Sequence, residues 1–375
     1  GNVSTLGVGT FGEVFNATVK IGGQAFPVAV KRQWVTSRWT YDAERKKEAV
    51  RREITALSAL NGTTGFVGYY GSHVADGKAY TFMQIADKDL YDYSTYLYKC
   101  RKARRKRPIE EPAEPRARSA EIVGVDEHDE PVVEEVGLPV PPPGFATLDV
   151  SCDVVDRVGQ SLAMQLLRAL AHMEEQGWVH FDVKLENCLV SGDCSTPGNC
   201  NLMLTDFAFS CGPQLGKCEK PLGTPEYMAP ELWPKVFDSR NPLVPDKADV
   251  WSAGMVCFEL ILGAWPKQLQ KAAKEAEKMQ NEMGRSRTTE LGKFIFKRFN
   301  PALDSKLQTA GPWRPLLVSM LQRDPAERVT MREAYAHALQ IADAEGLPPL
   351  PEQPFPDEVP QELLARLGAE APSFE

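Results

Sequence analysis

The chain has 375 residues and a mass of 41.6 kDa, and its 43% hydrophobic and 25% charged residues are ordinary globular values. The length excludes a small domain that depends on disulfides for its stability, and the composition excludes a chain that is disordered throughout. The formal charge of −8 gives no general attraction to nucleic acid or anionic membrane, and a basic partner or substrate fits better. The longest apolar stretch, 250–265, is interrupted by Ser252 and Glu259 and is too short to span a bilayer.

The first hundred residues are predicted to be mostly strand, with one helix. Residues 3–35 and 78–86 carry short runs of Val, Phe and Thr, and Gly22-Gly23 breaks the first of them at a tight turn. Over 41–60, apolar residues recur at steps of three and four, which predicts an amphipathic helix. The apolar positions of that helix are Val50, Ile54, Leu57 and Leu60.

Two segments are rich in proline and are not expected to join the core: 100–148, with eight of the 29 prolines, and 346–375, with seven. The first begins with the basic run 101–107, turns acidic, and has the composition of a solvated, disordered insertion. A partner or nuclear-import patch is the alternative for the basic run. Beyond the insertion, 152–177, 246–263 and 327–345 have helical periodicity. We therefore expect a small β-rich lobe (1–86), a larger helical lobe (87–345) and a tail.

Residues Gly7 to Gly12 match the pattern G-x-G-x-x-G, which both dinucleotide folds and plain glycine hairpins produce. A dinucleotide site needs a helix directly after the last glycine, whereas 13–20 and 26–30 are predicted strands. The loop is therefore predicted to be a β-hairpin whose backbone covers phosphates from above. Val14 follows where an adenine-contacting apolar residue belongs.

The next strand ends in Val28-Ala29-Val30-Lys31, which brings an ammonium group within reach of the α- and β-phosphates. Such a lysine needs an acidic partner. Glu53, one turn before Leu57 on the inner face of the 41–60 helix, is the preferred partner, with Glu48 as the alternative because the sequence does not fix the helix register.

The strongest signal is the segment 179–189, followed by 204–208. Phosphoryl transfer needs a group that orients the acceptor hydroxyl and charges that stabilise the transferred group. Asp182 is the predicted base, and Lys184 is predicted to neutralise charge on the γ-phosphoryl group. Asn187 and Asp206 are predicted to hold Mg²⁺ between the phosphates.

Taken in order, these motifs resemble the eukaryotic protein kinase family over roughly residues 5–345, the insertion excepted. The segment 223–231 is similar to that family's substrate-docking and A-P-E segment, and 249–254 is similar to the central helix whose aspartate braces the catalytic loop. Arg328 resembles the arginine that pairs with Glu231. The resemblance implies an α+β bilobal fold with ATP and Mg²⁺ between the lobes and protein hydroxyls as substrates.

The resemblance also assigns individual roles. Lys184 together with Thr224 resembles the Ser/Thr branch, Met83 the gatekeeper, 84–86 the hinge, and Leu57, His180 and Phe207 members of the apolar spine. The catalytic set is expected to be Asp182, Lys184, Lys31, Glu53 and Thr224. The nucleotide-binding set is expected to be Gly7, Val8, Gly9, Thr10, Phe11, Gly12, Val14, Ala29, Lys31, Met83, Gln84, Ile85, Ala86, Asp89, Glu186 and Leu189.

Two positions depart from the family pattern. His180-Phe181-Asp182 stands in place of H-R-D, and Asp206-Phe207-Ala208 in place of D-F-G. Phenylalanine cannot grip a phosphate as arginine does, and no Ser or Thr lies between Ser210 and Thr224. We therefore expect a non-RD kinase that is active without activation-loop phosphorylation. Alanine is a small replacement for glycine but has less backbone freedom. We therefore expect Ala208 to make this segment change less often to an inactive conformation, and not to abolish activity.

Five of the eight cysteines lie between 188 and 218. Cys194 and Cys200 bracket one turn, and Cys211 and Cys218 bracket another. One or two local disulfides are therefore a hypothesis, each stabilising by about 2–3 kcal/mol. Free thiols are the alternative in a reducing compartment. Zinc is a third option, although C-x-x-C spacing is lacking.

The missing arginine, the cysteines and the insertion together are similar to the secreted rhoptry kinases of apicomplexan parasites. That resemblance implies secretion, and without it a cytoplasmic location is expected. A monomer is expected in either case. Glu186 and Asp89 resemble positions that hold substrate arginines, and Glu226 adds acidity, so a preference for basic substrates is expected. Ser119, after Arg116-Ala117-Arg118, is then a candidate for autophosphorylation. The rival hypothesis is a pseudokinase that binds nucleotide without catalysis.

Overall fold

The structure is a computed structural model of the chain. It describes residues 4–9, 12–21, 24–36, 40–106, 121–125, 131–134, 152–194, 196–215, 223–224, 226–232, 245–263 and 305–352. Over 99–106, 121–125 and 131–134, and at residues 4, 8, 9, 21, 24, 40–42, 152, 153 and 155, it describes the backbone alone. Thr10, Phe11, Ser119 and Cys218 therefore lie outside the described residues. Within these ranges, no helix is long and apolar enough to cross a membrane.

The N-terminal part is a five-stranded antiparallel sheet with the strand order β1-β2-β3-β5-β4. The glycine motif joins the first two strands, and Gly9 pairs with Gly12 across the turn. The predicted hairpin is therefore confirmed. The bounds are β1 Ser4–Gly9, β2 Gly12–Ile21, β3 Gln24–Trp34, β4 Tyr69–Ala75 and β5 Lys78–Met83.

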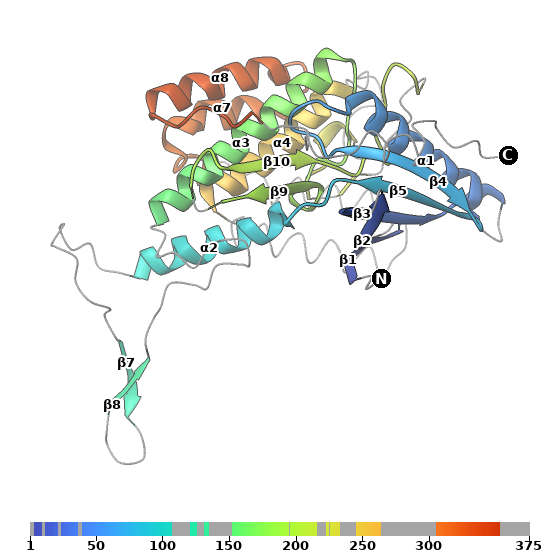
Figure 1. The fold of residues 1–375 in the computed structure, drawn as a ribbon. Helices are drawn as coiled ribbons and strands as arrows, with labels where there is room; N and C mark the ends of the chain where they lie inside the picture. The colour runs from blue at the N-terminus through green and yellow to red at the C-terminus, as the bar shows by residue number, and fades with distance from the viewer. Residues whose placement is uncertain are drawn as a thin grey trace.

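One helix, α1 (Thr40–Leu60), accompanies this sheet (Figure 1). The predicted apolar stripe is buried, because Val50, Ile54, Leu57 and Leu60 are all at most 2% exposed. The stripe places Glu53 on the same buried side, where the residue is 0% exposed. Glu48 instead pairs with Arg51 and Arg52. The alternative prediction, that Glu48 is the acidic partner of Lys31, is therefore wrong.

The C-terminal part is helical, as Figure 1 shows. Helix α3 is its centre and packs against α2, α4 and α8 and against the strand β10. Near the N-terminal sheet lies a small sheet in the order β10-β9-β6. The bounds are β6 Lys88–Asp89, α2 Leu90–Lys106, α3 Cys152–Glu175, β9 Cys188–Gly192, β10 Cys200–Leu204, α4 Pro245–Leu262, α7 Arg314–Met320 and α8 Met331–Ala344.

Local sequence accounts for where these helices begin and for the faces they bury. Thr330 and Glu333 form a reciprocal capping box at the start of α8, which satisfies amide groups that the first turn leaves unpaired. Helix α4 is buried on all sides from Ala248 to Leu262, because α2, α3, α7 and α8 surround it. The α+β kinase-like fold expected from the sequence is confirmed.

The insertion at 100–148 differs from the prediction in two places. Helix α2 continues through the basic run to Lys106, because Lys and Arg are good helix formers. Two further strands, β7 (Glu121–Val125) and β8 (Pro131–Glu134), form an antiparallel hairpin of their own. The prediction of a wholly disordered insertion is therefore wrong at these residues.

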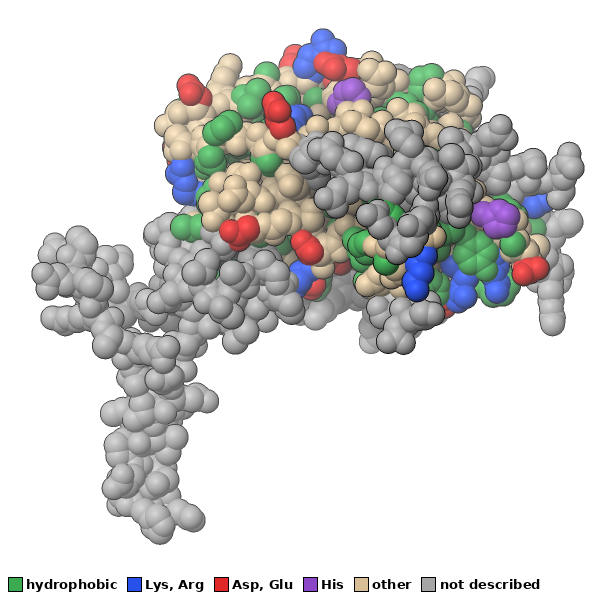
Figure 2. All heavy atoms as spheres, in the orientation of Figure 1, with side chains coloured by type: hydrophobic (Ala, Val, Ile, Leu, Met, Phe, Trp, Pro, Cys, Tyr) green, Lys and Arg blue, Asp and Glu red, His purple; other side chains and the backbone are tan. Residues whose placement is uncertain are grey.

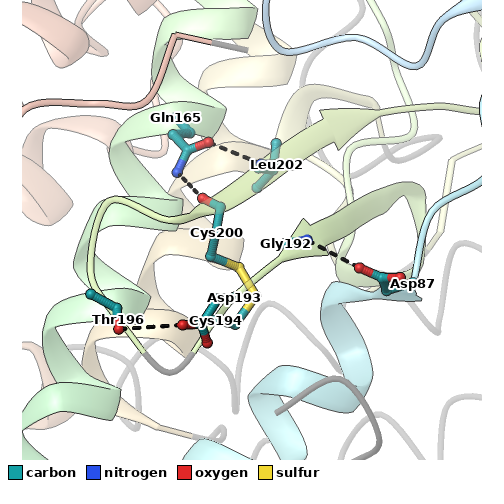
Figure 3. Close-up of a disulfide and its surroundings, with 8 residues drawn as sticks. All are labelled: Asp87, Gln165, Gly192, Asp193, Cys194, Thr196, Cys200 and Leu202. Atoms are coloured by element: carbon teal, nitrogen blue, oxygen red, sulfur yellow. Dashed lines mark hydrogen bonds between the residues drawn. A yellow bond between two sulfur atoms is a disulfide. The ribbon is translucent and has the colours of Figure 1, made fainter. Parts of the chain in front are cut away.

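A disulfide between Cys194 and Cys200 closes the turn that joins β9 to β10, as Figure 3 shows. Gln165 on α3 holds the same hairpin, because its side-chain amide donates to the carbonyl of Cys200 at 2.8 Å and accepts from the amide of Leu202 at 2.9 Å. Cys211 is also disulfide-bonded. The hypothesis of a local staple is confirmed for Cys194 and Cys200, which rules out free thiols and a zinc site at these two residues.

The first residues of the C-terminal tail lie against the helical part. Arg157 and Arg168 on α3 donate to backbone carbonyls of Glu345 and Pro351, at 3.3 and 3.1 Å. Leu347 and Leu350 pack against the core. The tail is therefore docked at least as far as Glu352. On the face shown in Figure 2, acidic and basic side chains of the described residues are both present, so the net charge is not one uniform acidic field.

Candidate active site

Lys31 on β3 lies between two carboxylates that come from distant parts of the chain. Its Nζ donates to Oε1 of Glu53 at 2.6 Å and to Oδ1 of Asp206 at 2.8 Å. The two contacts join the sheet, α1 and the segment after β10. The sequence places these three side chains up to 175 positions apart, so the structure brings the predicted triad together.

The charges in this triad depend on one another. Burial by itself lowers the pKa of Lys31, but Asp206 and Glu53 outweigh burial and raise the pKa above its ordinary value, so Lys31 is a cation at neutral pH. Burial likewise acts to raise the pKa of Asp206, yet Lys31 lowers it overall. For Glu53, burial raises the pKa, and the contact with Lys31 opposes that shift. Lys31 therefore favours the ionised form of both carboxylates.

The glycine hairpin lies on the same sheet. Gly12 has a φ of +148°, and a Cβ atom there would lie 2.1 Å from the carbonyl oxygen of Arg32. Glycine is therefore required at this turn. Val14 pairs with Lys31, and Ala29 pairs with Met83. Because paired residues and alternate residues of a strand share a face, these four side chains lie on one face of the sheet.

Asp182 lies at the centre of a second cluster. Its Oδ1 accepts from the backbone amide and the hydroxyl of Thr224, at 3.0 and 2.8 Å. Its Oδ2 lies 2.9 Å from Nζ of Lys184, and Lys184 also donates to the Thr224 hydroxyl at 2.9 Å. The predicted base, the predicted cation and the predicted docking residue are therefore in mutual contact.

Asn187 also contacts Asp182. Its side-chain amide nitrogen donates to the backbone oxygen of Asp182 at 2.8 Å and to its Oδ2 at 3.1 Å. Because the nitrogen is used in this way, the amide oxygen is the atom that remains for a metal ion. The oxygen of Asn187 and the carboxylate of Asp206 are both hard oxygen donors, which suit Mg²⁺.

The segment that holds Asp182 is braced from α4. Asp249 accepts from the backbone amides of His180 and Phe181 at 2.6 and 2.8 Å, and burial raises the pKa of Asp249 to about 7. Phe181 and Asp206 both have φ above +60°, which is strained for residues other than glycine. A strained backbone conformation persists only where neighbouring contacts stabilise it. Such conformations are common at functional sites.

His180 joins this segment to Asp206. Burial lowers the pKa of its imidazole, so the ring is neutral. We assign the proton to Nε2, which then donates to the carbonyl of Thr205 at 3.0 Å, while Nδ1 accepts the amide of Asp182 at 3.2 Å. The ring of Phe207 lies 5.0 Å from that of His180, and Phe207 and Leu57 are buried in the same core. The expected contact between His180 and Phe207 is therefore present, and the place of Leu57 beside them stays a prediction.

The docking segment is anchored to the helical part. Both guanidinium Nη atoms of Arg328 donate to the carboxylate of Glu231, at 2.7 and 3.0 Å, and both side chains are nearly or fully buried. Tyr227 donates to Glu259 at 2.7 Å. The pair predicted from the sequence, Glu231 with Arg328, is thus present.

Residues 84–87, which include the predicted hinge, follow β5. Met83 is buried, and the amide of Gln84 donates to the carbonyl of Gly68 at 2.8 Å. The amide of Asp87 donates to Val190 at 3.1 Å, so both ends of the segment 84–87 are anchored. Leu189 on β9 pairs with Asp89 and packs against the core.

Asp89 and Glu186 have different surroundings. One carboxylate oxygen of Asp89 accepts the amide of Asp92 at 3.1 Å in the first turn of α2, and burial raises the pKa of Asp89. Glu186 is exposed. Asp89 therefore serves in part to cap α2, and Glu186 is the more available of the two acidic side chains.

Two further residues contact this site and were not predicted from the sequence. Gln33 on β3 donates to Glu53 at 3.0 Å. Arg52 on α1 donates to the carbonyl of Ser210 at 3.4 Å. Gln33 lies two residues after Lys31, so strand alternation placed it on the same face. That alternation was the available signal.

Comparison with known proteins agrees with this geometry. The family model described as "Protein kinase domain" matches residues 146–339, which is more than half of the chain. The chain therefore belongs to the protein kinase family. The matched range excludes the N-terminal sheet and α1, so the ion pairs of Lys31 are the observation that joins that part to the site.

Curated relatives are Ser/Thr kinases or catalytic chains of kinases. The chain is 29% identical over 179 residues to the phosphorylase b kinase gamma catalytic chain, liver/testis isoform, of Bos taurus, which covers 48% of this chain and 39% of that protein. It is 30% identical over 195 residues to serine/threonine-protein kinase ULK3 of Xenopus laevis (52% and 36%) and 32% identical over 199 residues to serine/threonine-protein kinase ATG1a of Arabidopsis thaliana (51% and 28%). The matched region therefore spans less than half of each relative.

Proposed function

We propose that this chain is an active Ser/Thr protein kinase that transfers the γ-phosphoryl group of ATP to hydroxyl groups of proteins. The observation that supports this proposal most is the cluster around Asp182. Its carboxylate contacts Lys184 at 2.9 Å and the hydroxyl of Thr224 at 2.8 Å. A side-chain hydroxyl thus already lies where an acceptor hydroxyl of a substrate would have to approach the carboxylate.

Each residue of the cluster then has a role in the transfer. Asp182 orients the acceptor hydroxyl and accepts its proton as the oxygen attacks the γ-phosphorus. Lys184 places a positive charge beside the transferred group, whose oxygens carry the developing charge. Thr224 holds both side chains in register through its hydroxyl. Positioning and charge are what this reaction chiefly requires.

The other predicted residues are proposed to bind the nucleotide. The hairpin 7–12 covers the phosphates, Lys31 contacts them, and Glu53 orients Lys31. Asn187 and Asp206 would hold Mg²⁺, which neutralises phosphate charge when it is bound. Val14, Ala29, Met83 and Leu189 would surround the adenine ring, with 84–86 beside its edge.

We further propose activity without phosphorylation of the activation loop. Phe181 is 4% exposed and has no group that could hold a phosphate. The segment after Asp206 has other supports: Cys211 and Val179 exchange two backbone hydrogen bonds, at 2.8 and 2.9 Å, and Arg52 reaches the carbonyl of Ser210. These contacts hold residues 210 and 211, at the start of the loop, without any added charge.

A preference for basic substrates is part of the proposal. Glu186 is exposed two residues after Lys184, near the place where a substrate peptide would pass. Asp89 supports the preference less, because α2 uses one of its oxygens. A basic side chain of the substrate is therefore proposed to meet Glu186.

Transfer of labelled phosphate from Mg-ATP to a basic protein tests the proposed function. We expect incorporation on Ser and Thr, and weaker incorporation into an acidic protein of similar size. Binding of nucleotide with no transfer to any protein would favour the pseudokinase, which the replacements Phe181 and Ala208 suggest. A shift of the unfolding temperature by nucleotide does not separate the two, since binding alone stabilises.

We also propose that the chain functions in an oxidising compartment, as its similarity to the secreted rhoptry kinases implies. Disulfides persist in such compartments and are rare in the cytosol, and Cys194 is bonded to Cys200. If thiols are alkylated in cells before lysis, these two cysteines should stay unmodified until a reductant is added. Their alkylation without reductant would contradict the proposal.

A further inference from the structure

Gln33 lies in the interior of the N-terminal part, beside the ion pair of Lys31. It is 2% exposed, and Glu53 is 0% exposed. Its Nε2 donates to Oε2 of Glu53 at 3.0 Å, while Lys31 donates to Oε1 of the same carboxylate at 2.6 Å. Each oxygen of Glu53 therefore has its own donor from β3. A carboxylate only accepts hydrogen bonds, which fixes the orientation of the Gln33 amide.

The oxygen of the Gln33 side-chain amide makes no such contact. Its Oε1 is buried and has no hydrogen-bond partner among the described residues. A buried acceptor without a partner destabilises a fold, whereas an apolar side chain of the same shape does not. Packing therefore does not explain an amide at this position. The contact with Glu53 does.

Lys31 divides its hydrogen bonds between Glu53 and other acceptors. Its ammonium is shared with Asp206 at 2.8 Å, and the proposed function requires it to turn to the phosphates when nucleotide binds. The contact from Gln33 involves neither Asp206 nor the phosphates, so it can persist while Lys31 changes partners. Gln33 is thus placed to keep the Glu53 carboxylate, and with it α1, in one position.

We propose that Gln33 is a positioning residue for the nucleotide site: its amide fixes the Glu53 carboxylate so that Lys31 is aimed at the phosphates. This inference rests on the proposed function, since it assigns Lys31 to the nucleotide. It extends that function to a residue outside the sequence motifs. It also supplies a support for α1 that needs no phosphate on the activation loop.

The test is the affinity for Mg-ATP of Gln33→Met, a variant of similar length that cannot donate. Thr81→Val is the matched control, because Thr81 lies opposite Lys31 on β5, is 0% exposed, and has a hydroxyl without a partner among the described residues. We expect Gln33→Met to bind Mg-ATP about tenfold more weakly, as for loss of a hydrogen bond to a charged group. Thr81→Val should bind as the wild type does.

A second variant, Gln33→Glu, separates a positioning role from a space-filling one. It places a carboxyl against Oε2 of Glu53, with Lys31 and Asp206 as the other charged groups that face the pair. At low pH the two carboxyls can share a proton, and as the pH rises they repel, because like charges raise one pKa of such a pair. The loss of Mg-ATP affinity relative to wild type should therefore grow with pH. A positioning role also predicts that at low pH Gln33→Glu, which then has a proton to donate to Oε2, binds Mg-ATP more tightly than Gln33→Met. A space-filling role would give it no such advantage.

The outcomes distinguish the inference from the function on which it rests. If the wild type binds Mg-ATP and Gln33→Met binds it equally well, Gln33 has no positioning role and the inference is overturned alone. An equal loss in Thr81→Val would also overturn it, because the effect would then belong to the sheet face in general. A wild type that binds no Mg-ATP would overturn the proposed function and the inference together.

Discussion

Replacing Asp182 with alanine should lower phosphoryl transfer by about 10²–10⁴-fold, the contribution that a positioned general base usually makes. The carboxylate is the one group of the cluster that contacts Lys184, Thr224 and Asn187 together. Its loss removes the base and leaves those three side chains without their common partner. Turnover of a basic protein substrate under saturating Mg-ATP measures the effect.

Two controls accompany this variant. Asp182→Asn keeps the shape and can still meet Thr224 and Lys184 by hydrogen bonds, but it accepts no proton, so we expect it to be nearly as inactive. Asp343→Asn changes an exposed carboxylate near the end of α8 and should retain full activity. Asp182→Ala turning over at the rate of Asp343→Asn would show that Asp182 is not the base.

The Lys31→Met variant should lose both activity and stability. Lys31 is 9% exposed at its side chain and Glu53 only 1%, so methionine leaves a buried carboxylate without its cation. Removing one partner of a buried ion pair costs about 3–5 kcal/mol. Urea unfolding measures the loss. The exposed pair of Lys47 with Glu44 provides the control Lys47→Met, which should cost less than about 1 kcal/mol.

The stability of Lys31→Met should depend on pH in a defined direction. Burial raises the pKa of Glu53 above its ordinary value, and without Lys31 nothing of opposite charge opposes that shift. The folded variant then binds a proton more tightly than the unfolded chain, so its stability falls as pH rises above the ordinary carboxyl pKa. Adding Glu53→Gln should restore part of the stability and weaken the pH dependence without restoring activity, because Asp206 also loses its cation in Lys31→Met. A double variant as unstable as Lys31→Met would contradict this account.

The sequence was sufficient for the architecture because its periodicities are strong. The apolar steps from Val50 to Leu60 predicted α1, and Gly22-Gly23 marked the turn between β2 and β3. Charge pattern was less reliable. The basic run after residue 100 was predicted to be a solvated loop, yet α2 continues through it, because exposed basic side chains are compatible with either state.

The site was predictable where a motif has a fixed spacing. Asp182, Lys184 and Asn187 lie within six positions, and the structure brings them together. Glu53 was harder, since a helix pattern alone left Glu48 open. Gln33 was not predicted, because a single glutamine in a strand is usually a surface residue. Its burial and its contact with Glu53 show otherwise.

The central claim is that the active arrangement is built into the chain and needs no phosphate on the activation loop. The most direct measurement is the turnover of a basic protein substrate by the wild type before and after treatment with a phosphatase, with phosphosites mapped by mass spectrometry. We expect unchanged turnover after the phosphatase is removed. A loss of activity that coincides with loss of a phosphate between residues 208 and 224 would contradict the claim.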